Sequence, residues 1–430
     1  MHSVRLSLVA PALLLCACKQ LGPHRAADVT STASADAGAA SPSATPRSAV
    51  APSPANTPVP TPAGVVIDGS YVPFNAAAPV LPIATPTPAP TNAAVDDLSF
   101  IDADYGWAVG EVCPRRPLSC QPALWQTADG GQTWRNTGTA PSPPVPTLPF
   151  QPGAAERLLF VSRQYGWIYG WRYGPQIYAT RDGGATWLAQ ALPASVYSIT
   201  YADGVLWAVL GQPCSAAALV DICQPQIIQS ANLGRSWDPF NNPLNPLSTL
   251  PKLLRLDGGR AWLFGDHLER TTDGGLHWTR RPLPSDCHRP NYFGPAAVSF
   301  AGGVLWLMCV GQASNGAQGR AIYTSTDAGD SWTEAFPPPS LSGLPLTADG
   351  YAHAMMAVTS RVALLCLTRG GPLQMTQNGG QSWRSLSMGG DVPCTALLFI
   401  DVLHGWMAEA GGVIWRTEDG GAHWQRVGLP

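Results

Sequence analysis

From Leu98 onward the chain alternates short apolar runs with turns rich in Gly, Asp and Asn. Leu98–Asp102 and Gly106–Gly110 form one pair of such runs, and Leu158–Val161 with Gly166–Gly170 form the next. The runs have the length of strands, and no apolar spacing of about 3.6 residues continues through them. The pattern therefore predicts many short strands joined by tight turns.

A turn motif that ends in tryptophan recurs seven times. It reads Ser/Thr-x-Asp/Asn-x-Gly-x-Ser/Thr/His-Trp, and its first copy runs from Thr127 to Trp134. Its acid or amide positions lie 53, 50, 41, 54, 51 and 41 residues apart, at Asp129, Asp182, Asn232, Asp273, Asp327, Asn378 and Asp419. Its tryptophans are Trp134, Trp187, Trp237, Trp278, Trp332, Trp383 and Trp424. Seven copies at this spacing indicate a repeat architecture.

The residue types of the motif have structural uses. An Asp or Asn oxygen can accept hydrogen bonds from backbone amides a few residues later and close a tight turn. The Gly allows a backbone conformation that a side chain would disfavour, and the Trp can pack under the turn. His277 and His423 occupy the Ser/Thr/His position of the motif, so we interpret them as structural.

Each repeat also has an apolar strand pattern before the motif, with a tryptophan in the second strand of six repeats and Leu364 in the sixth. Each unit thus supplies an inner strand, a second strand, a third strand ending at the motif, and a fourth starting after the motif Trp. A single sheet of this kind cannot bury both faces, whereas a closed ring can. The sequence predicts an all-β fold, a seven-bladed β-propeller of four-stranded antiparallel blades, over residues 95–430.

The first 18 residues predict export. Met1–Arg5 is basic, and the apolar stretch Leu6–Leu15 is too short to span a bilayer as a mature helix. The residues before Cys18 resemble a bacterial lipoprotein box, which implies cleavage before Cys18 and a lipid on its thiol. An ordinary secretory signal is the alternative. Lipidation would anchor the exported protein to the bacterial cell envelope or surface.

Residues 19–94 are rich in Ala, Pro, Ser and Thr and predict a disordered linker. As a coil, this segment would span about 50 Å and let the propeller stand clear of a membrane. Two short apolar patches, at Val65–Ile67 and Tyr71–Phe74, interrupt the composition. They indicate a strand that docks on the propeller.

The repeats resemble the bacterial neuraminidase repeat, or Asp-box, propellers, and are most similar to the photosystem II assembly and stability factor branch of that superfamily. The resemblance rests on the seven turn motifs and on elements such as Gly106–Gly110, and it covers about residues 95–430. It implies the propeller fold. It implies less about function, because the fold hosts sialidases, glucanases, sorting receptors and assembly scaffolds.

Composition narrows the class of partner and the chemistry. Charged residues make up 12% of the chain and the net charge is −3, which disfavours nucleic acid. No Cys-x-x-Cys pair or His-x-x-x-His spacing predicts a metal site, and no cofactor is expected. Eight cysteines follow Cys18, and disulfides are expected in an exported domain. The local pairs Cys113–Cys120 and Cys214–Cys223 are predicted; for Cys287, Cys309, Cys366 and Cys394 we favour 287–309 and 366–394, but the pairing stays open.

The long connections between predicted strands should gather at one end of the propeller: 111–122, 211–224 and 309–320 within blades, and 138–154, 239–250, 281–294 and 334–352 between blades. Insertions at one face of a repeat array usually mark its working surface. Arg and aromatic residues favoured in binding hot spots occur there. The candidate binding residues are Arg115, Arg116, Trp171, Arg172, Tyr173, Arg280, Arg281, His288, Arg289, Tyr292 and Phe293.

Two classes of function compete. A sialidase-like hydrolase needs three arginines around the substrate carboxylate, a Tyr–Glu couple and an acid, and the Arg-Ile-Pro motif of that family is absent from the first repeat. Glu111 and Glu409 near second-strand ends are the carboxylates that could serve a glycoside hydrolase. We predict instead a non-catalytic, surface-tethered binding scaffold that acts as a monomer, contacts a protein partner and helps to assemble a membrane complex. Carbohydrate or cell-wall binding is the further alternative.

Overall fold

The structure is a computed structural model. It describes residues 64–67, 70–73, 93–113, 120–138, 140–141, 157–170, 173–215, 218–240, 251–288, 292–314, 317–336, 352–367, 373–386, 388, 393–409 and 411–430, all within the compact unit Pro60–Pro430. The predicted signal peptide and Cys18 lie outside these residues. The described helical structure is the short 3-10 helix η2 (Ser285–His288). Within the described residues, no helix is long and apolar enough to cross a bilayer.

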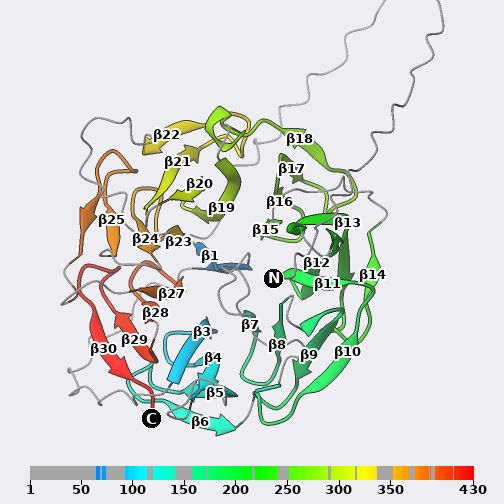
Figure 1. Cartoon of the computed structure of the whole chain (residues 1–430), viewed down its shortest axis with the longest axis vertical. Helices are drawn as coiled ribbons and strands as arrows, with labels where there is room; N and C mark the ends of the chain where they lie inside the picture. The colour runs from blue at the N-terminus through cyan, green and yellow to red at the C-terminus, as the bar shows by residue number, and fades with distance from the viewer. Residues whose placement is uncertain are drawn as a thin grey trace, which may run out of the picture. The chain divides into compact units, whose positions relative to one another are not determined.

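The described strands form seven antiparallel sheets around a common axis, as the sequence predicts (Figure 1). Each blade holds four consecutive strands, from the innermost to the outermost. Blades 1 to 3 comprise β3 (Ala93–Phe100), β4 (Gly106–Val112), β5 (Gln121–Thr127) and β6 (Arg135–Gly138); β7 (Arg157–Phe160), β8 (Gly166–Tyr169), β9 (Gln176–Thr180) and β10 (Leu188–Ala191); and β11 (Ser195–Ala202), β12 (Val205–Ser215), β13 (Ala218–Ser230) and β14 (Asp238–Pro239).

Blades 4 to 7 repeat this order. They comprise β15 (Lys252–Arg255), β16 (Ala261–Phe264), β17 (Leu268–Thr271) and β18 (Thr279–Arg281); β19 (Tyr292–Ala301), β20 (Val304–Ser314), β21 (Ala317–Ser325) and β22 (Thr333–Phe336); β23 (Ala352–Ala357), β24 (Ala363–Leu367), β25 (Gln374–Thr376) and β26 (Arg384–Ser385); and β27 (Cys394–Phe399), β28 (Gly405–Glu409), β29 (Val413–Thr417) and β30 (Gln425–Gly428).

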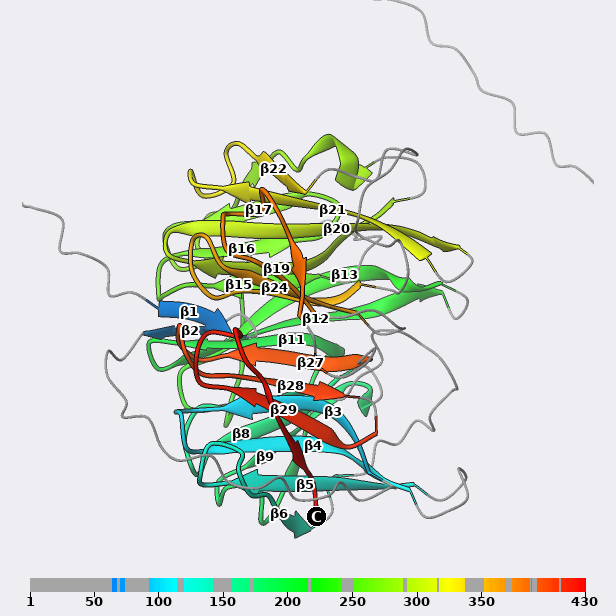
Figure 2. The same ribbon diagram turned by 90° about the vertical axis from the view of Figure 1, so that its left-hand side faces the viewer.

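Because the strands of a blade alternate in direction, their connections alternate between two ends of the propeller. The short-turn end carries the seven turn motifs and the turns from the first to the second strand. The long-loop end carries the other connections. Two long connections predicted there as loops, 211–224 and 309–320, are instead extended hairpins, in which β12–β13 and β20–β21 continue past β-bulges (Figure 2). The pairing continues past these bulges as far as Ser215–Ala218 and Ser314–Ala317.

All seven turn motifs fold alike. The Ser or Thr hydroxyl accepts a hydrogen bond from the amide of the motif Gly at 2.8–3.0 Å. The Asp or Asn Oδ1 accepts one from the amide four residues later at 2.9–3.0 Å. The motif Gly has φ between 75° and 97°, the left-handed region that favours glycine. The recurring polar groups are therefore used within the turns.

Hydrogen bonds within the motif also set the ionisation of its acids. The backbone amide of His277, followed by its ring, lowers the pKa of Asp273 to about 2. His277 Nδ1 lies 2.7 Å from Asp273 Oδ2, and His423 Nδ1 lies 2.6 Å from Asp419 Oδ2. Both histidines therefore take the place of the Ser or Thr hydroxyl that contacts the acid in other copies.

Neighbouring blades are joined through the second-strand tryptophans. Trp107 of blade 1 stacks on Phe160 of blade 2 with ring centroids 3.8 Å apart, and its Nε1 donates to Gly183 O in the blade 2 turn motif at 3.0 Å. Trp406 of blade 7 stacks in the same way on Phe100 of blade 1, with ring centroids 3.6 Å apart. Its Nε1 donates to Gly130 O in the blade 1 turn motif at 2.9 Å. In the described part of the chain, no blade combines strands from both ends of the sequence. These side-chain contacts therefore close the ring.

One blade boundary uses a cation in place of the phenylalanine. Arg255 of blade 4 lies over the Trp207 ring of blade 3, 4.2 Å from its centroid, and its Nη1 donates to Val205 O at 2.6 Å. Arg255 is only 2% exposed, and this burial lowers its pKa to about 10. The guanidinium remains charged at neutral pH and is held by the aromatic face and the carbonyl.

A hairpin of β1 (Gly64–Ile67) and β2 (Ser70–Pro73) lies within the segment predicted as disordered linker. It extends blade 5 to six strands, with Val65 of β1 opposite Ala301 of β19. In Figure 1 β1 lies near the axis, and Figure 2 places it at the end opposite the tips of β20 and β21. The linker prediction is thus corrected at this hairpin, because β-branched residues there favour a strand; the strand docks as the apolar patches indicated.

Disulfides join Cys113 to Cys120, Cys287 to Cys309, and Cys366 to Cys394 among the described residues. These are the pairs that the sequence predicts or favours. The first disulfide joins the residue after β4 to the residue before β5, and the second joins η2 to β20. The third joins the end of β24 in blade 6 to the start of β27 in blade 7. The side chains of Cys214 and Cys223 lie outside the description, so their pairing stays a prediction.

Candidate functional site

Many predicted binding residues lie outside the described parts of the chain. This holds for Arg115, Arg116, Trp171, Arg172 and Arg289. His288 belongs to η2, and Tyr292 and Phe293 to the start of β19, but their side chains are not among those described. Their role in binding stays a prediction.

Tyr173 is a core residue, which corrects its assignment to the binding surface. Its side chain is 0% exposed, and its hydroxyl donates to Pro141 O at 3.1 Å. Its ring meets Tyr178 edge-on, with centroids 5.3 Å apart. A tyrosine with an apolar body and a satisfied hydroxyl is stable in a core, and sequence composition alone does not separate this case from an exposed aromatic.

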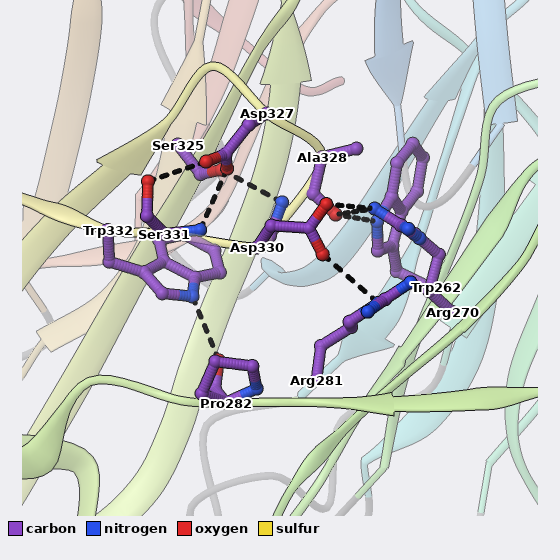
Figure 3. A network of polar contacts seen from close by, with 11 residues as sticks. Trp262, Arg270, Arg281, Pro282, Ser325, Asp327, Ala328, Asp330, Ser331 and Trp332 are labelled. Carbon is purple, nitrogen blue, oxygen red and sulfur yellow. Dashed lines mark hydrogen bonds and ion pairs between the residues drawn. The ribbon is translucent and has the colours of Figure 1, made fainter.

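Arg281 joins blades 4 and 5 (Figure 3). Its Nε lies 3.1 Å from Asp330 Oδ1, and Arg270 Nη1 lies 3.1 Å from Asp330 Oδ2. Beside them Trp262 Nε1 donates to Ala328 O at 2.9 Å. Arg281 therefore has a structural contact at the blade boundary. Arg280 next to it is exposed on the outer strand β18.

A cavity lies at the centre of the ring and is lined by the inner strands of all seven blades. In each inner strand, we take as the reference residue the one that pairs with the second-strand Trp, or with Leu364 in blade 6. Two residues before it, blades 1 to 4 carry polar residues and blades 5 to 7 carry alanine: Asp97, Arg157, Ser198, Lys252, Ala297, Ala354 and Ala396. At this level, toward the long-loop end, the cavity thus has a polar half and an apolar half, and Thr395 of blade 7 lines it beside the alanines.

The charges in the polar half are partly balanced between blades. Asp97 is 7% exposed and its Oδ2 accepts a hydrogen bond from the Leu158 amide at 3.0 Å. Arg157 Nη1 lies 3.9 Å from Asp97 Oδ1. With Lys252 added, the lining residues contain one acid and two bases. The described lining therefore offers charged groups of both signs that a polar ligand can contact.

Five inner strands carry a β-bulge next to this layer of residues. The bulges lie at Asp96, Tyr197, Ala296, His353 and Thr395. Burial raises the pKa of Tyr197, so its phenol remains a hydrogen-bond donor at neutral pH. Thr395 Oγ1 donates to Val95 O of the neighbouring blade at 2.7 Å. Bulges redirect side chains and are frequent beside binding sites.

The cavity offers groups for binding and few for catalysis. Its described lining contains a single carboxylate, Asp97, and a single arginine, Arg157. Glycoside hydrolysis requires two placed carboxylates, and a sialidase requires three arginines. Glu409 Oε2 accepts a hydrogen bond from Trp415 Nε1 at 3.0 Å, so it has a structural contact. Glu111 lies near the sulfurs of Cys113 and Cys120, but a disulfide leaves no thiolate to bind a metal.

The sequence analysis did not predict four cavity residues, because they lie within inner strands and not in the long connections: Asp97, Arg157, Ser198 and Lys252. The register supplies a signal that could have found them: each stands two positions before the residue that pairs with the second-strand tryptophan. A polar residue at this position of an inner strand lines the central cavity in blades 1 to 4.

The fold and the cavity define the class of the protein: a seven-bladed β-propeller with a central binding cavity. No protein-family model matches the chain. Over 133 residues, 30% of the chain, it is 29% identical to the photosystem II assembly lipoprotein Ycf48 of Synechococcus sp. (strain CC9902). The match spans 34% of that protein, about a third of its length.

Two solved structures show the same architecture. YCF48 from Cyanidioschyzon merolae superposes with a TM-score of 0.51 at 17% identity, covering 78% of this chain and 98% of that one. A GH74 xyloglucanase from Xanthomonas campestris gives a TM-score of 0.54 at 14% identity, covering 80% of this chain and 55% of the enzyme. Likenesses at these identities establish the fold alone, so function has to be argued from the site.

Proposed function

We propose that this chain is a non-catalytic, surface-tethered propeller that binds a protein partner at its long-loop end and takes part in the assembly of a membrane complex. The observation that carries the proposal is the divided cavity, polar in blades 1 to 4 and apolar in blades 5 to 7. The partial sequence match to an assembly lipoprotein supports the same role.

An extended segment of a protein fits both halves of this cavity. Its carbonyl or carboxylate groups would face Arg157, Ser198 and Lys252, and its apolar side chains would face Ala297 and Ala396. Backbone and carboxylate oxygens accept hydrogen bonds from such groups. The hairpins β12–β13 and β20–β21 project at the same end and would supply further contact area around the cavity.

Capture of the partner after chemical crosslinking in the producing cell tests the site. Lys252→Glu reverses a charge in the cavity, so we expect recovery of the crosslinked partner to fall roughly tenfold, the loss that corresponds to about 1.4 kcal/mol. Arg426→Glu makes the same charge change at an exposed position of the outer strand β30 and is the matched control. The control should capture the partner as the unaltered protein does.

Equal recovery with both variants would contradict the proposed site. Circular dichroism of the purified variants should show intact propellers, so that a loss of partner is not a loss of fold. If polysaccharide rather than protein is recovered, and Lys252→Glu abolishes that recovery, the cavity binds carbohydrate and the protein-partner proposal fails.

We propose that a lipid on Cys18 anchors the protein to the bacterial cell envelope. The support is the sequence before Cys18, which has the pattern of a lipoprotein box. Replacement by Ser should move the protein from the detergent-rich to the aqueous phase in a detergent partition, because the thiol that would carry the lipid is gone. Continued membrane association of Cys18→Ser would argue against the anchor.

A further inference from the structure

The short-turn end of the inner strands carries a ring of apolar residues, which we call the collar. Each member stands two positions after the reference residue that pairs with the second-strand Trp or Leu: Ile101, Val161, Ala202, Leu256, Ala301, Val358 and Ile400. An apolar side chain in all seven blades at one level contrasts with the divided cavity further along the axis. Such a ring is stabilised when it is covered from water.

The β1–β2 hairpin lies at this end. It pairs with β19 at the collar residue Ala301 and lies mainly against β11, β15, β19 and β27 of blades 3, 4, 5 and 7. The collar residues of these four blades are all buried, with exposures between 0% and 7%. The two that are half-buried, Ile101 and Val161, belong to blades 1 and 2. The collar is therefore partly exposed in blades 1 and 2, away from the strands that the hairpin mainly contacts, whereas Val358 of blade 6 is buried at 1% without being among those contacts.

The sequence of the hairpin fits a surface of this kind. Gly64–Ile67 and Ser70–Pro73 contain valine, isoleucine and tyrosine within a segment otherwise dominated by Ala, Pro, Ser and Thr. An isolated two-stranded hairpin is marginally stable in water, so its formation depends on the surface that it covers. Pairing with the free inner edge of β19 also satisfies backbone groups that an edge strand leaves open.

We infer that the Gly64–Pro73 hairpin is an intramolecular plug that covers the collar and closes the short-turn end of the central channel. The divided cavity then opens toward the long-loop end. This fixes the direction from which a ligand reaches the cavity; the identity of that ligand rests on the proposed function, whereas the plug itself does not.

Hydrogen exchange on the full chain tests the plug. In the unaltered protein, amides of residues 64–73 should exchange at least roughly tenfold more slowly than their unstructured rates, because the hairpin is held on the collar. Val65→Pro removes the amide at the residue that faces Ala301, so protection across 64–73 should be lost. Replacement of residues 64–73 by Gly and Ser should have the same effect on the collar as Val65→Pro.

The matched control replaces residues 40–49 by Gly and Ser and should leave exchange unchanged elsewhere. An apolar dye such as 8-anilinonaphthalene sulfonate should bind more strongly to the two hairpin variants than to the control, since the collar is uncovered. Unprotected amides at 64–73 in the unaltered protein, or equal dye binding by all variants, would overturn the inference. Loss of partner capture with Lys252→Glu depends on the cavity alone, so the two proposals can fail separately.

Discussion

The closure of the ring depends on Trp406, and Trp406→Ala tests it. Trp406 is 1% exposed and joins blade 7 to blade 1 through the Phe100 ring and the carbonyl of Gly130. Truncation of a buried Trp costs about 3–5 kcal/mol. Of this, aromatic stacking supplies about 1 kcal/mol and the hydrogen bond about 1 kcal/mol, the rest being lost apolar burial. This is a large share of a typical stability of about 5–15 kcal/mol.

The free energy of unfolding should be measured by urea titration followed by circular dichroism. Trp107→Ala is the matched control, because Trp107 makes the same contacts between blades 1 and 2. Both variants should lose a similar free energy, but hydrogen exchange should locate the local opening of Trp406→Ala at β3 and β27, on the two sides of the closure. Trp406→Leu should lose less, since Leu364 fills this place in blade 6.

A loss below about 1 kcal/mol for Trp406→Ala would refute this reasoning, because a buried aromatic that closes the ring cannot be removed at so small a cost. Similar exchange patterns for the two Trp variants would show that the boundary between blades 7 and 1 behaves like any other boundary. In that case closure would not depend specifically on Trp406.

Three further predictions concern the turns and one blade boundary. Thr180→Val should cost about 1–3 kcal/mol in urea unfolding, because the buried Gly184 amide loses its acceptor, whereas Thr180→Ser should be nearly neutral. Asp273 has a pKa of about 2 against 3.8 for an unperturbed Asp, so its contribution to the free energy of unfolding is present above pH 3.8 and is lost as the pH falls through 2. In Asp273→Asn the melting temperature should therefore depend less on pH over this window. An unchanged dependence of the melting temperature on acid pH would contradict the assignment. Arg255→Ala should lower the free energy of unfolding by roughly 3 kcal/mol, because the contact with Trp207 and the hydrogen bond to a backbone carbonyl are lost. Phe is the residue type at this place in blades 1, 2, 5 and 7. Arg255→Phe should therefore lose less than half of that free energy in the same titration.

The sequence predicts the fold well because the turn motif encodes a local structure. Its hydroxyl, acid and Gly form the same hydrogen bonds in every copy, so counting motifs counts blades. The spacing between motifs then leaves room for four strands in each blade. Composition alone predicts the hairpin at residues 64–73 poorly, because the Pro-rich segment around it is typical of disorder. Two short patches with β-branched residues nevertheless form a hairpin there, and its strand β1 pairs with β19.

The site is less predictable, because it depends on register across blades far apart in the sequence. Arg281 and Asp330 pair between blades 4 and 5, and Tyr173 packs in a core, although Arg and Tyr look like binding residues in a linear sequence. Conversely, Asp97 and Lys252 lie outside the turn motifs and the long connections, and the closed ring brings them to one cavity.

A photocrosslinking amino acid at Ser198, on the inner strand that lines the cavity, tests the central claim most directly. The same group at Leu188, 64% exposed at the start of the outer strand β10, is the control. Crosslinking in the producing cell should join Ser198, but not Leu188, to one protein, and fragmentation should place the link within an extended segment of that partner. Links from Leu188 alone, or from neither position, would contradict a partner site in the cavity.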